Sequence, residues 1–333
     1  MSTKIQKTYN DIQKAVADSR SVLIFSHSAP DGDSIGSQLA FQNYILDCGK
    51  DVVIINDGAF PGLYKNLPDI EVIRDINNYS IKEVEKKPDL IVVLDCSNLE
   101  RLAKAQELII DNIPIINIDH HPDNSEFGNI NIVNSSSSST SEILTEYFLG
   151  IDHTIDRKTA SLLYTGILTD TGRFRFESTS RRTMELVGVL IERGANPRKI
   201  CDDIYYSIPP SILKMTGKML EDAEFYENGK ICLMELNKEN IKKHNASFGD
   251  FDGLAEYTLH TENALVGALL KELEDKNIKV SLRSKGNINV SKVAHIYGGG
   301  GHRNASGFVM KSSQKESRKK LLDNLKGLVD ASV

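Results

Sequence analysis

The stretch that decides the fold is VLIFSHSAPDGD, residues 22–33, in which four apolar residues lead into a histidine and two aspartates. The same arrangement recurs twice. LIVVLD at residues 90–95 ends in an aspartate, and IINIDHH at residues 115–121 ends in an aspartate and two histidines. Short, fully apolar runs are typical of buried strands in a parallel sheet. Because ligands of open α/β sheets bind beyond the carboxyl ends of the strands, we expect these polar side chains to converge on one site.

Strands and helices alternate along the first half of the chain, which predicts a parallel sheet covered by helices on both faces. The first helix is expected to be capped by Asp33 and Ser34. A serine run at residues 135–139 precedes an apolar-periodic segment, and we interpret it as a loop that ends in a helix N-cap rather than as a linker. A further helix, predicted over residues 157–169, delivers Asp170 at its end.

The length of 333 residues predicts two domains. Breaks at Gly194-Ala195-Asn196-Pro197 and at Pro209-Pro210 bound a connecting segment. We therefore predict a catalytic, metal-binding domain over residues 1–193, a connecting segment over residues 194–210, and a smaller α/β domain over residues 211–333.

Composition limits the classes of function. The formal net charge of −6 argues against a long groove that tracks duplex nucleic acid, although it allows a short anionic substrate. The four cysteines are scattered without the paired spacing of zinc or redox sites, so we interpret them as thiols in a reducing compartment. The sequence shows no signal peptide and no apolar run of about 20 residues, which predicts a cytoplasmic protein without a membrane partner. Monomer and homodimer both stay open.

The polar residues at the predicted strand and helix ends offer two imidazoles and four carboxylates. They are His27, Asp31, Asp33, Asp95, His120 and Asp170. Four crowded carboxylates repel one another unless cations neutralise them, and two divalent ions supply four positive charges. Oxygen and nitrogen ligands without thiolate fit Mn²⁺, with Fe²⁺, Co²⁺ and Mg²⁺ as alternatives. A pair of such ions is typical of phosphoester or phosphoanhydride hydrolysis.

Each piece alone has an ordinary structural explanation. An isolated Asp-His-His triplet is more often a surface turn than a metal site, and Asp95 could serve only as a helix cap. Arg173 and Arg175 alternate with Phe174 and Phe176, which favours a half-exposed strand. The conjunction of the clusters, all at predicted strand or helix ends of one domain, favours the metal centre.

With these clusters, the chain resembles a known family, the DHH phosphoesterases with their DHH-associated second domain. The matching motifs are His27-x-x-x-Asp31-x-Asp33, Asp95, Asp119-His120-His121 and GILTDTG at residues 166–172, followed by SLRSK at residues 281–285 and GGGGHRNASG at residues 298–307. The resemblance covers nearly the whole chain. It is closest to the branch that degrades very short RNAs, called nanoRNA, to mononucleotides and dephosphorylates 3′-phosphoadenosine 5′-phosphate (pAp) to AMP. It implies an active site in the cleft between the two domains.

The resemblance also implies a role for each matching residue. His27 and Asp31 hold one metal ion, Asp33, His120 and Asp170 hold the other, and Asp95 bridges them. Asp119 orients a neighbouring histidine, and His121 faces the substrate phosphate or the leaving group. The substrate-binding residues implied for the second domain are Arg283, Gly299, Gly300, Gly301 and His302. The glycines allow close approach of the backbone and point N–H groups at an anion.

One departure and several alternatives accompany this resemblance. The chain has Glu256-Tyr257-Thr258-Leu259 where the branch often has Asn-Tyr-Pro-Arg, so a substrate contact from that loop is not carried over. Within the same architecture, the chain could hydrolyse pApA or cyclic di-AMP. An inorganic pyrophosphatase is disfavoured because residues 298–307 replace its Ser-Arg-Lys motif, and a long-substrate DNA exonuclease because no basic channel is apparent. A non-catalytic nucleotide-binding regulator would predict missing metal ligands, and none is missing.

Overall fold

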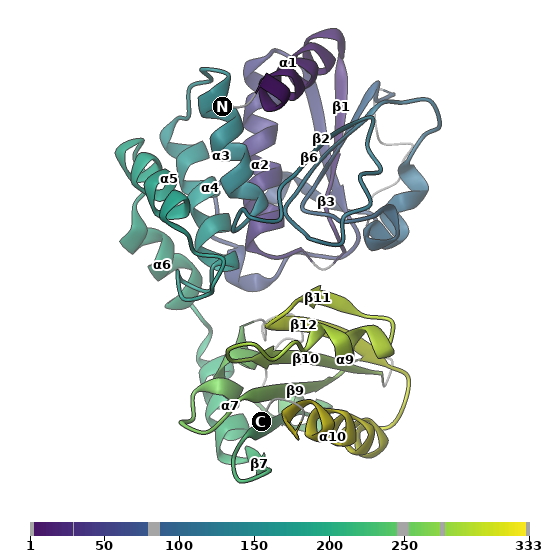
Figure 1. Ribbon diagram of the computed structural model, residues 1–333, viewed down its shortest axis with the longest axis vertical. Coiled ribbons are helices and arrows are strands. Elements are labelled where there is room, and N and C mark those ends of the chain that lie inside the picture. The colour runs from purple at the N-terminus through teal and green to yellow at the C-terminus, as the bar shows by residue number, and fades with distance from the viewer. Residues whose placement is uncertain (1–2, 29, 79–86, 245–252, 274–276, 331–333) are drawn as a thin grey trace. The chain divides into compact units, whose positions relative to one another are not determined.

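The computed structural model describes residues 3–28, 30–78, 87–244, 253–273 and 277–330. The chain divides into two compact units, Met1–Ser207 and Ile208–Val333, and each has its own sheet and its own core (Figure 1). Helix α6 (Pro197–Tyr205), which lies in the segment predicted to connect the domains, belongs to the first unit. No helix among the described residues is long and apolar enough to cross a membrane.

The first unit is built on a six-stranded parallel sheet, as the apolar runs predicted. Its order is β3-β2-β1-β4-β5-β6, and every neighbouring pair is parallel. The strands are β1 (Ser21–Phe25), β2 (Asp51–Asn56), β3 (Ile73–Asp75), β4 (Leu90–Leu94), β5 (Ile115–Asp119) and β6 (Ile130–Val133). The chain moves outward in one direction from β1 to β3 and in the other from β4 to β6. The order therefore reverses between β1 and β4, and such a reversal leaves a crevice at the carboxyl ends of the strands.

Alternate residues of these strands belong to two hydrophobic cores, one on each face of the sheet. Ile24, Val92 and Ile116 pack with helices on one face, whereas Phe25 and Val93 pack against the other face. The helices on the first face are α1 (Thr3–Asp18), α2 (Gly32–Asp47), α3 (Thr140–Gly150) and α4 (Arg157–Asp170), with α5 (Arg181–Glu192) and α6 beside them. The other face is covered by the 3₁₀ segment η4 (Leu99–Leu108). Two short 3₁₀ turns, η1 (Gly62–Tyr64) and η2 (Ile70–Val72), complete the unit.

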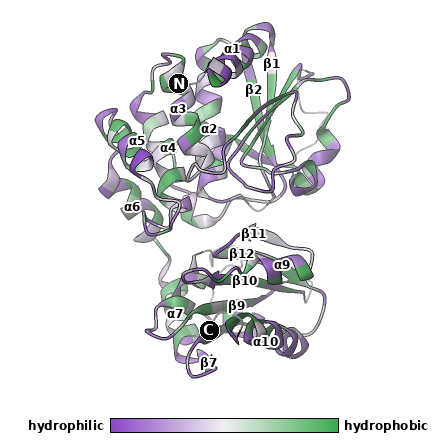
Figure 2. Ribbon diagram, in the orientation of Figure 1, coloured by the Kyte–Doolittle hydropathy of each residue, from purple (hydrophilic) through white to green (hydrophobic). Residues whose placement is uncertain are grey.

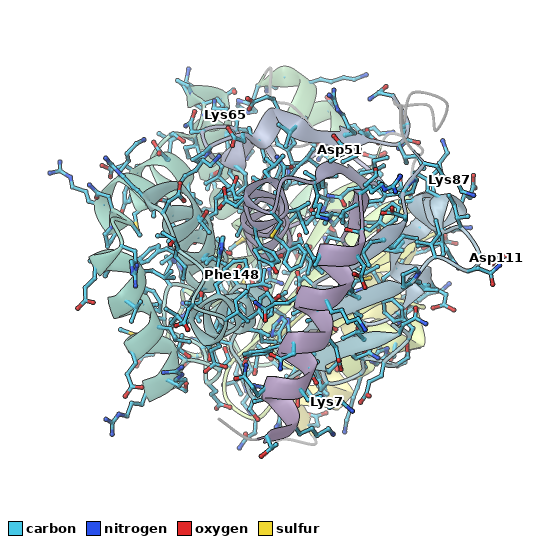
Figure 3. All side chains as sticks on the ribbon, turned by 90° about the horizontal axis from the view of Figure 1, so that it is seen from above. Lys7, Asp51, Lys65, Lys87, Asp111 and Phe148 are labelled. Atoms are coloured by element: carbon cyan, nitrogen blue, oxygen red, sulfur yellow. The ribbon has the colours of Figure 1, made fainter. Side chains whose placement is uncertain are left out.

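The colouring by hydropathy matches this layering. Strands β1 and β2 are green in Figure 2, and the outer helices carry purple on their exposed sides. In Figure 3 the charged side chains of Lys7, Lys65 and Asp111 lie at the periphery, whereas Phe148 lies within the unit, where it is fully buried. Burial of such side chains on both faces is the main stabilising contribution to a sheet of this kind.

Two local expectations for the first unit are wrong. Helix α2 begins at Gly32 with Asp31 as its N-cap, so Asp33 lies inside the first turn instead of capping it. Residues 173–176 do not form a strand. Gly172, Arg173 and Phe174 have φ of 55°, 64° and 63°, which makes a left-handed turn. The N–H groups of Phe174, Arg175 and Phe176 donate back to Thr171 and close this turn.

The second unit has a six-stranded mixed sheet of order β11-β12-β10-β9-β8-β7, in which only β8 and β9 are parallel. The strands are β7 (Glu224–Tyr226), β8 (Ile231–Leu236), β9 (Val266–Glu272), β10 (Ile278–Ser284), β11 (Gly300–His302) and β12 (Ala305–Met310). One core lies against α9 (Ser291–Ile296) and α10 (Gln314–Asp330). The other lies against α7 (Pro210–Glu221), α8 (Lys238–Lys243) and the 3₁₀ segment η5 (Leu254–Leu259).

Part of the glycine run of the second unit forms a strand. Gly298, at φ 74°, follows the end of α9, and Gly300 and Gly301 form the edge strand β11, paired with β12. A Cβ at Gly299 would lie 2.4 Å from the Cβ of Phe308, so this position requires glycine for packing. The tight packing of a β-hairpin therefore accounts for part of the run.

Candidate metal centre

The polar residues that follow β1, β4 and β5 lie close together at the carboxyl ends of these strands. His27 lies two residues beyond β1, and Asp95 follows β4 directly. His27 Nε2 and Asp95 Oδ2 are 3.4 Å apart, and both side chains are more than nine-tenths buried. Asp119 ends β5, and His120 and His121 follow it, with ring nitrogens 3.5 and 3.6 Å from Asp95 Oδ1. The reversal of strand order thus brings together residues from three different strand ends.

Asp95 lies at the centre of this cluster. Its backbone has φ 54°, in the left-handed region that residues other than glycine seldom adopt. Its Oδ2 faces His27, and its Oδ1 lies 3.5 Å from His120 Nε2. Aspartate tolerates this backbone better than most residues, and backbone strain of this kind clusters at functional sites. The turn directs the two carboxylate oxygens toward different neighbours.

Among the described residues of the first unit, three donor sets contain Asp95, and two of them lie on either side of its carboxylate. In each set, the possible ligand atoms all lie within 4.8 Å of one another: one set is His27, Asp31 and Asp95, and the other is Asp33, Asp95 and His120. Asp170, the last residue of α4, joins the second set, because its Oδ2 lies 3.2 Å from His120 Nε2. This division is the one that the resemblance implied for two metal ions.

Asp119 contacts His121. Its Oδ1 lies 2.7 Å from His121 Nδ1, and its Oδ2 accepts a hydrogen bond of 2.7 Å from the Asn124 amide. The three atoms Asp95 Oδ, Asp119 Oδ and His121 N also form a compact donor set. Asp119 is completely buried. A buried carboxylate on one ring nitrogen fixes the orientation and tautomer of an imidazole, so His121 presents its other nitrogen in a defined direction.

The N-terminus of α3 contributes to the site, which the sequence did not lead us to expect. The backbone N–H groups of Thr140 and Ser141 donate to Asp33 Oδ2 and Oδ1 over 2.6 and 2.9 Å. The Thr140 hydroxyl donates to Asp95 Oδ1 over 3.2 Å. The only signal was the serine run before an apolar-periodic helix. We interpreted it correctly as a loop ending in an N-cap, since Ser139 caps α3, but it gave no indication of the carboxylates that α3 meets.

The electrostatics of the site reflect crowded negative charge. Burial, with the charge of Asp95, raises the pKa of Asp33 from 3.8 to about 7, and burial raises the pKa of Asp170 well above its usual value. Burial alone would lower the pKa of His120, but the surrounding carboxylates, Asp170 first, raise it to about 9. Burial also opposes ionisation of Asp95, yet the hydrogen bond from His27 and the nearby imidazoles hold its pKa below the usual range.

These pKa shifts test whether the site fits cations. Asp33 and Asp170 resist ionisation because they are buried and, to a smaller extent, because neighbouring carboxylates repel their charge; bound cations would relieve both effects. Hard oxygen donors and imidazole without thiolate suit divalent ions of the Mn²⁺ class. The donor set of the first unit therefore fits metal ions by charge and by ligand type.

The predicted substrate-binding residues all belong to the second unit. Arg283 lies on β10, where its guanidinium donates to the Leu282 carbonyl over 2.9 Å. Gly300, Gly301 and His302 form β11. Their assignment to substrate binding stays a prediction.

The comparisons with known proteins agree with the motifs. Residues 21–167 match the N-terminal domain of the DHH family, and residues 228–331 match the DHHA1 domain. The chain is 30% identical over 298 residues to the bifunctional oligoribonuclease and PAP phosphatase NrnA of Thermus thermophilus, covering 87% of this chain and 84% of that protein. It is 29% identical to the probable enzyme of the same name from Streptococcus mutans, covering 86% of this chain and 88% of that protein.

A solved structure is similar over almost the entire length. The crystal structure of an exopolyphosphatase-related protein from Bacteroides fragilis superposes with a TM-score of 0.89 at 29% identity, covering 97% of this chain and 96% of that one. The similarity therefore includes both units.

Proposed function

We propose that this chain, which belongs to the DHH family of phosphoesterases, is a metal-dependent enzyme that hydrolyses oligoribonucleotides of a few residues to mononucleotides and pAp to AMP. The observation that carries the proposal is the position of Asp95. One carboxylate, held at φ 54°, belongs to both donor sets and directs one oxygen toward each.

The metal-binding side chains of the proposal are those of the two donor sets. His27 and Asp31 would hold one ion, Asp33, His120 and Asp170 the other, and Asp95 would bridge them; Mn²⁺ is the ion we propose. Divalent cations bound there would make water more acidic and neutralise negative charge on the phosphate. Burial of Asp33, Asp95 and His120 excludes bulk water from these contacts, and therefore strengthens them.

The second role in the first unit is proton transfer. One oxygen of Asp119 accepts a hydrogen bond from the Asn124 amide, and the other contacts His121 Nδ1. The Nε2 atom of His121 is therefore directed away from this carboxylate. We assign His121 to the phosphate or to the leaving oxygen, where an oriented imidazole serves as a proton donor. Arg283, His302 and the backbone of Gly299, Gly300 and Gly301 are assigned to the part of the substrate away from the scissile bond.

The names of the relatives support the choice of substrate. The proteins of Thermus thermophilus and Streptococcus mutans carry both activities in their names, and the similarity extends over more than four-fifths of each chain. A terminal phosphate or a single nucleotide needs only a few cations for binding, which suits a chain with a net charge of −6.

The experiment is a turnover panel with Mn²⁺. The substrates are pAp, pApA, cyclic di-AMP, RNAs of two to five nucleotides, a 24-mer RNA of the same composition, and pyrophosphate. We expect pAp and the shortest RNAs to have the highest kcat/KM. A kcat/KM on the 24-mer comparable to that on a five-mer would contradict the preference for short substrates.

The other outcomes identify the alternatives. A preference for pApA or cyclic di-AMP would assign the chain to dinucleotide hydrolysis in the same architecture. Faster turnover of pyrophosphate than of any nucleotide would replace the proposal with a pyrophosphatase. Tight nucleotide binding without turnover of any substrate would indicate a regulator.

A further inference from the structure

The first turn of helix α3 makes a contact that the helix itself does not need. Ser139 already caps α3, because its side chain accepts the backbone N–H of Glu142 over 3.0 Å. The next two backbone N–H groups, from Thr140 and Ser141, donate to the two oxygens of Asp33. The N–H groups in the first turn of α3 therefore have acceptors other than the Thr140 hydroxyl.

The Thr140 hydroxyl is directed to Asp95. Its Oγ1 lies 3.2 Å from Asp95 Oδ1, and both residues are almost completely buried. Two other buried helical threonines, Thr145 and Thr165, donate to the backbone carbonyl four residues earlier, whereas Thr183 donates to the Glu142 carboxylate. The bond from Thr140 instead joins the start of α3 to a side chain that follows β4.

This bond distinguishes the two oxygens of Asp95. Oδ1 receives the hydroxyl and lies 3.5 Å from His120 Nε2, whereas Oδ2 lies 3.4 Å from His27 Nε2. The carboxylate of an aspartate rotates about the Cβ–Cγ bond, and this torsion angle has a broad distribution unless a hydrogen-bond partner restricts it. A fixed donor on one side restricts that rotation and keeps one oxygen for each donor set.

We propose that Thr140 is a positioning residue of the metal centre, which holds the Asp95 carboxylate in the orientation that serves both donor sets. The inference rests on the proposed function in that it takes the donor sets as metal sites. Partners of this kind behind a metal ligand are worth roughly ten- to a hundredfold in metal affinity or activity.

The test compares Thr140→Ser with Thr140→Ala and Thr140→Val. Serine keeps the hydroxyl, alanine differs from serine by that oxygen alone, and valine keeps the volume and branching of threonine. The matched control is Thr145→Val, the same change on the same helix, at a buried hydroxyl that bonds only to the Ser141 carbonyl. For each variant, Mn²⁺ alone is titrated by calorimetry, the thermal midpoint is measured without metal, and kcat and KM are measured at saturating Mn²⁺.

We expect Thr140→Ala and Thr140→Val to weaken Mn²⁺ binding about tenfold or more and to lower kcat with little change in KM. Thr140→Ser and Thr145→Val should bind Mn²⁺ within about twofold of the wild type. A merely structural hydroxyl would lower the thermal midpoint of Thr140→Val and Thr145→Val alike and leave Mn²⁺ affinity unchanged, and that result would overturn the inference.

The serine and alanine variants decide the question if valine prevents folding, because equal Mn²⁺ affinity in those two variants would also overturn it. The proposed function fails in a different way. A wild type that binds Mn²⁺ but hydrolyses no substrate of the panel would overturn the proposed function, while the affinities would still decide the role of Thr140.

Discussion

At the scale of single residues, Asp95 carries the most chemistry. The apolar run before it indicated a strand end, and from that we inferred a shared site with His27 and His120. The left-handed backbone of Asp95 could not be predicted, because aspartate after a strand is compatible with several turns. The backbone conformation of Asp95 determines which carboxylate oxygen faces His27 and which faces His120. An aspartate can adopt this conformation but does not require it, so the sequence alone does not predict the geometry.

We expect Asp95→Asn to abolish hydrolysis and to leave the fold intact. Asparagine tolerates φ near 54°, but its amide lacks the charge that two cations would share. The loss should be several kcal/mol of transition-state stabilisation, or at least about a hundredfold in kcat. Asp89→Asn is the matched control, since Asp89, just before the start of the same strand, accepts backbone N–H groups of Arg20 and Ser21. Wild-type turnover of Asp95→Asn at saturating Mn²⁺ would exclude the bridging role.

Gly172 offers a second test at this scale, because it supports the turn directly after Asp170. Its φ is 55°, and a Cβ there would lie 2.5 Å from the ring of Phe176. Gly172→Ala should therefore lower the free energy of unfolding by at least about 1–2 kcal/mol and reduce kcat by displacing Asp170. The control is Gly188→Ala on α5, where a Cβ meets nothing within 4 Å and alanine should stabilise by roughly 0.5–1 kcal/mol. The measurements are denaturant midpoints and kcat for both variants. Equal effects of the two substitutions would show that the turn after Asp170 does not require glycine at position 172.

At the scale of elements, the sequence predicted most of the strands and helices that position the site. Strands β1, β4 and β5 could be identified because they are buried on both faces and therefore mostly apolar, although β5 includes the buried Asn117. The start of α2 was placed wrongly because Asp31 and Asp33 both precede a plausible first turn. Only the hydrogen bonds that the N–H groups of Asp33 and Ser34 donate to the Asp31 carboxylate identify Asp31 as the cap. Residues 173–176 alternate like a strand in sequence, but Thr171 accepts the N–H groups of residues 174–176, and the segment forms a turn.

A buried polar link between elements supports the His27 loop and can be tested. Asn56, at the end of β2, accepts the Ser26 N–H over 3.0 Å and exchanges hydrogen bonds of 2.9 and 2.8 Å with Gln38 of α2. Asn56→Ala should destabilise the protein by about 1–3 kcal/mol or more, because it leaves the buried Gln38 amide and the Ser26 N–H without this partner.

A double-mutant cycle separates this link from simple loss of packing. We expect Asn56→Ala and Gln38→Ala to be coupled, with an interaction energy of roughly 0.5–3 kcal/mol in denaturant unfolding. Strict additivity of the two changes would show that the paired amides do not act together. The same variants should also weaken Mn²⁺ binding, if Ser26 sets the position of His27.

At the scale of the whole molecule, the order of the strands could not be obtained from the sequence. Alternation of strands and helices predicts a parallel sheet, but it does not state that β1 pairs with both β2 and β4. That pairing creates the reversal at which His27 and Asp95 meet. All six proposed metal ligands thus come from the first unit, between His27 and Asp170, whereas Arg283 and His302 belong to the second. If the first unit binds the metal ions and the second unit binds the substrate, a substitution in one unit should leave the function of the other unchanged.

His302→Ala tests that division. Because no proposed metal ligand lies in the second unit, the variant should bind Mn²⁺ with wild-type stoichiometry. Removal of a charge-assisted phosphate contact should cost roughly 1.5–3 kcal/mol, or about ten- to a hundredfold in kcat/KM, expressed more in KM than in kcat. The control is His260→Ala, at an exposed histidine of the same unit that makes an edge-on ring contact with Tyr257, and it should leave both constants unchanged. Loss of bound metal from His302→Ala, or a collapse of kcat at constant KM, would place His302 in the chemistry rather than in substrate binding, and the two units would then share the catalytic step.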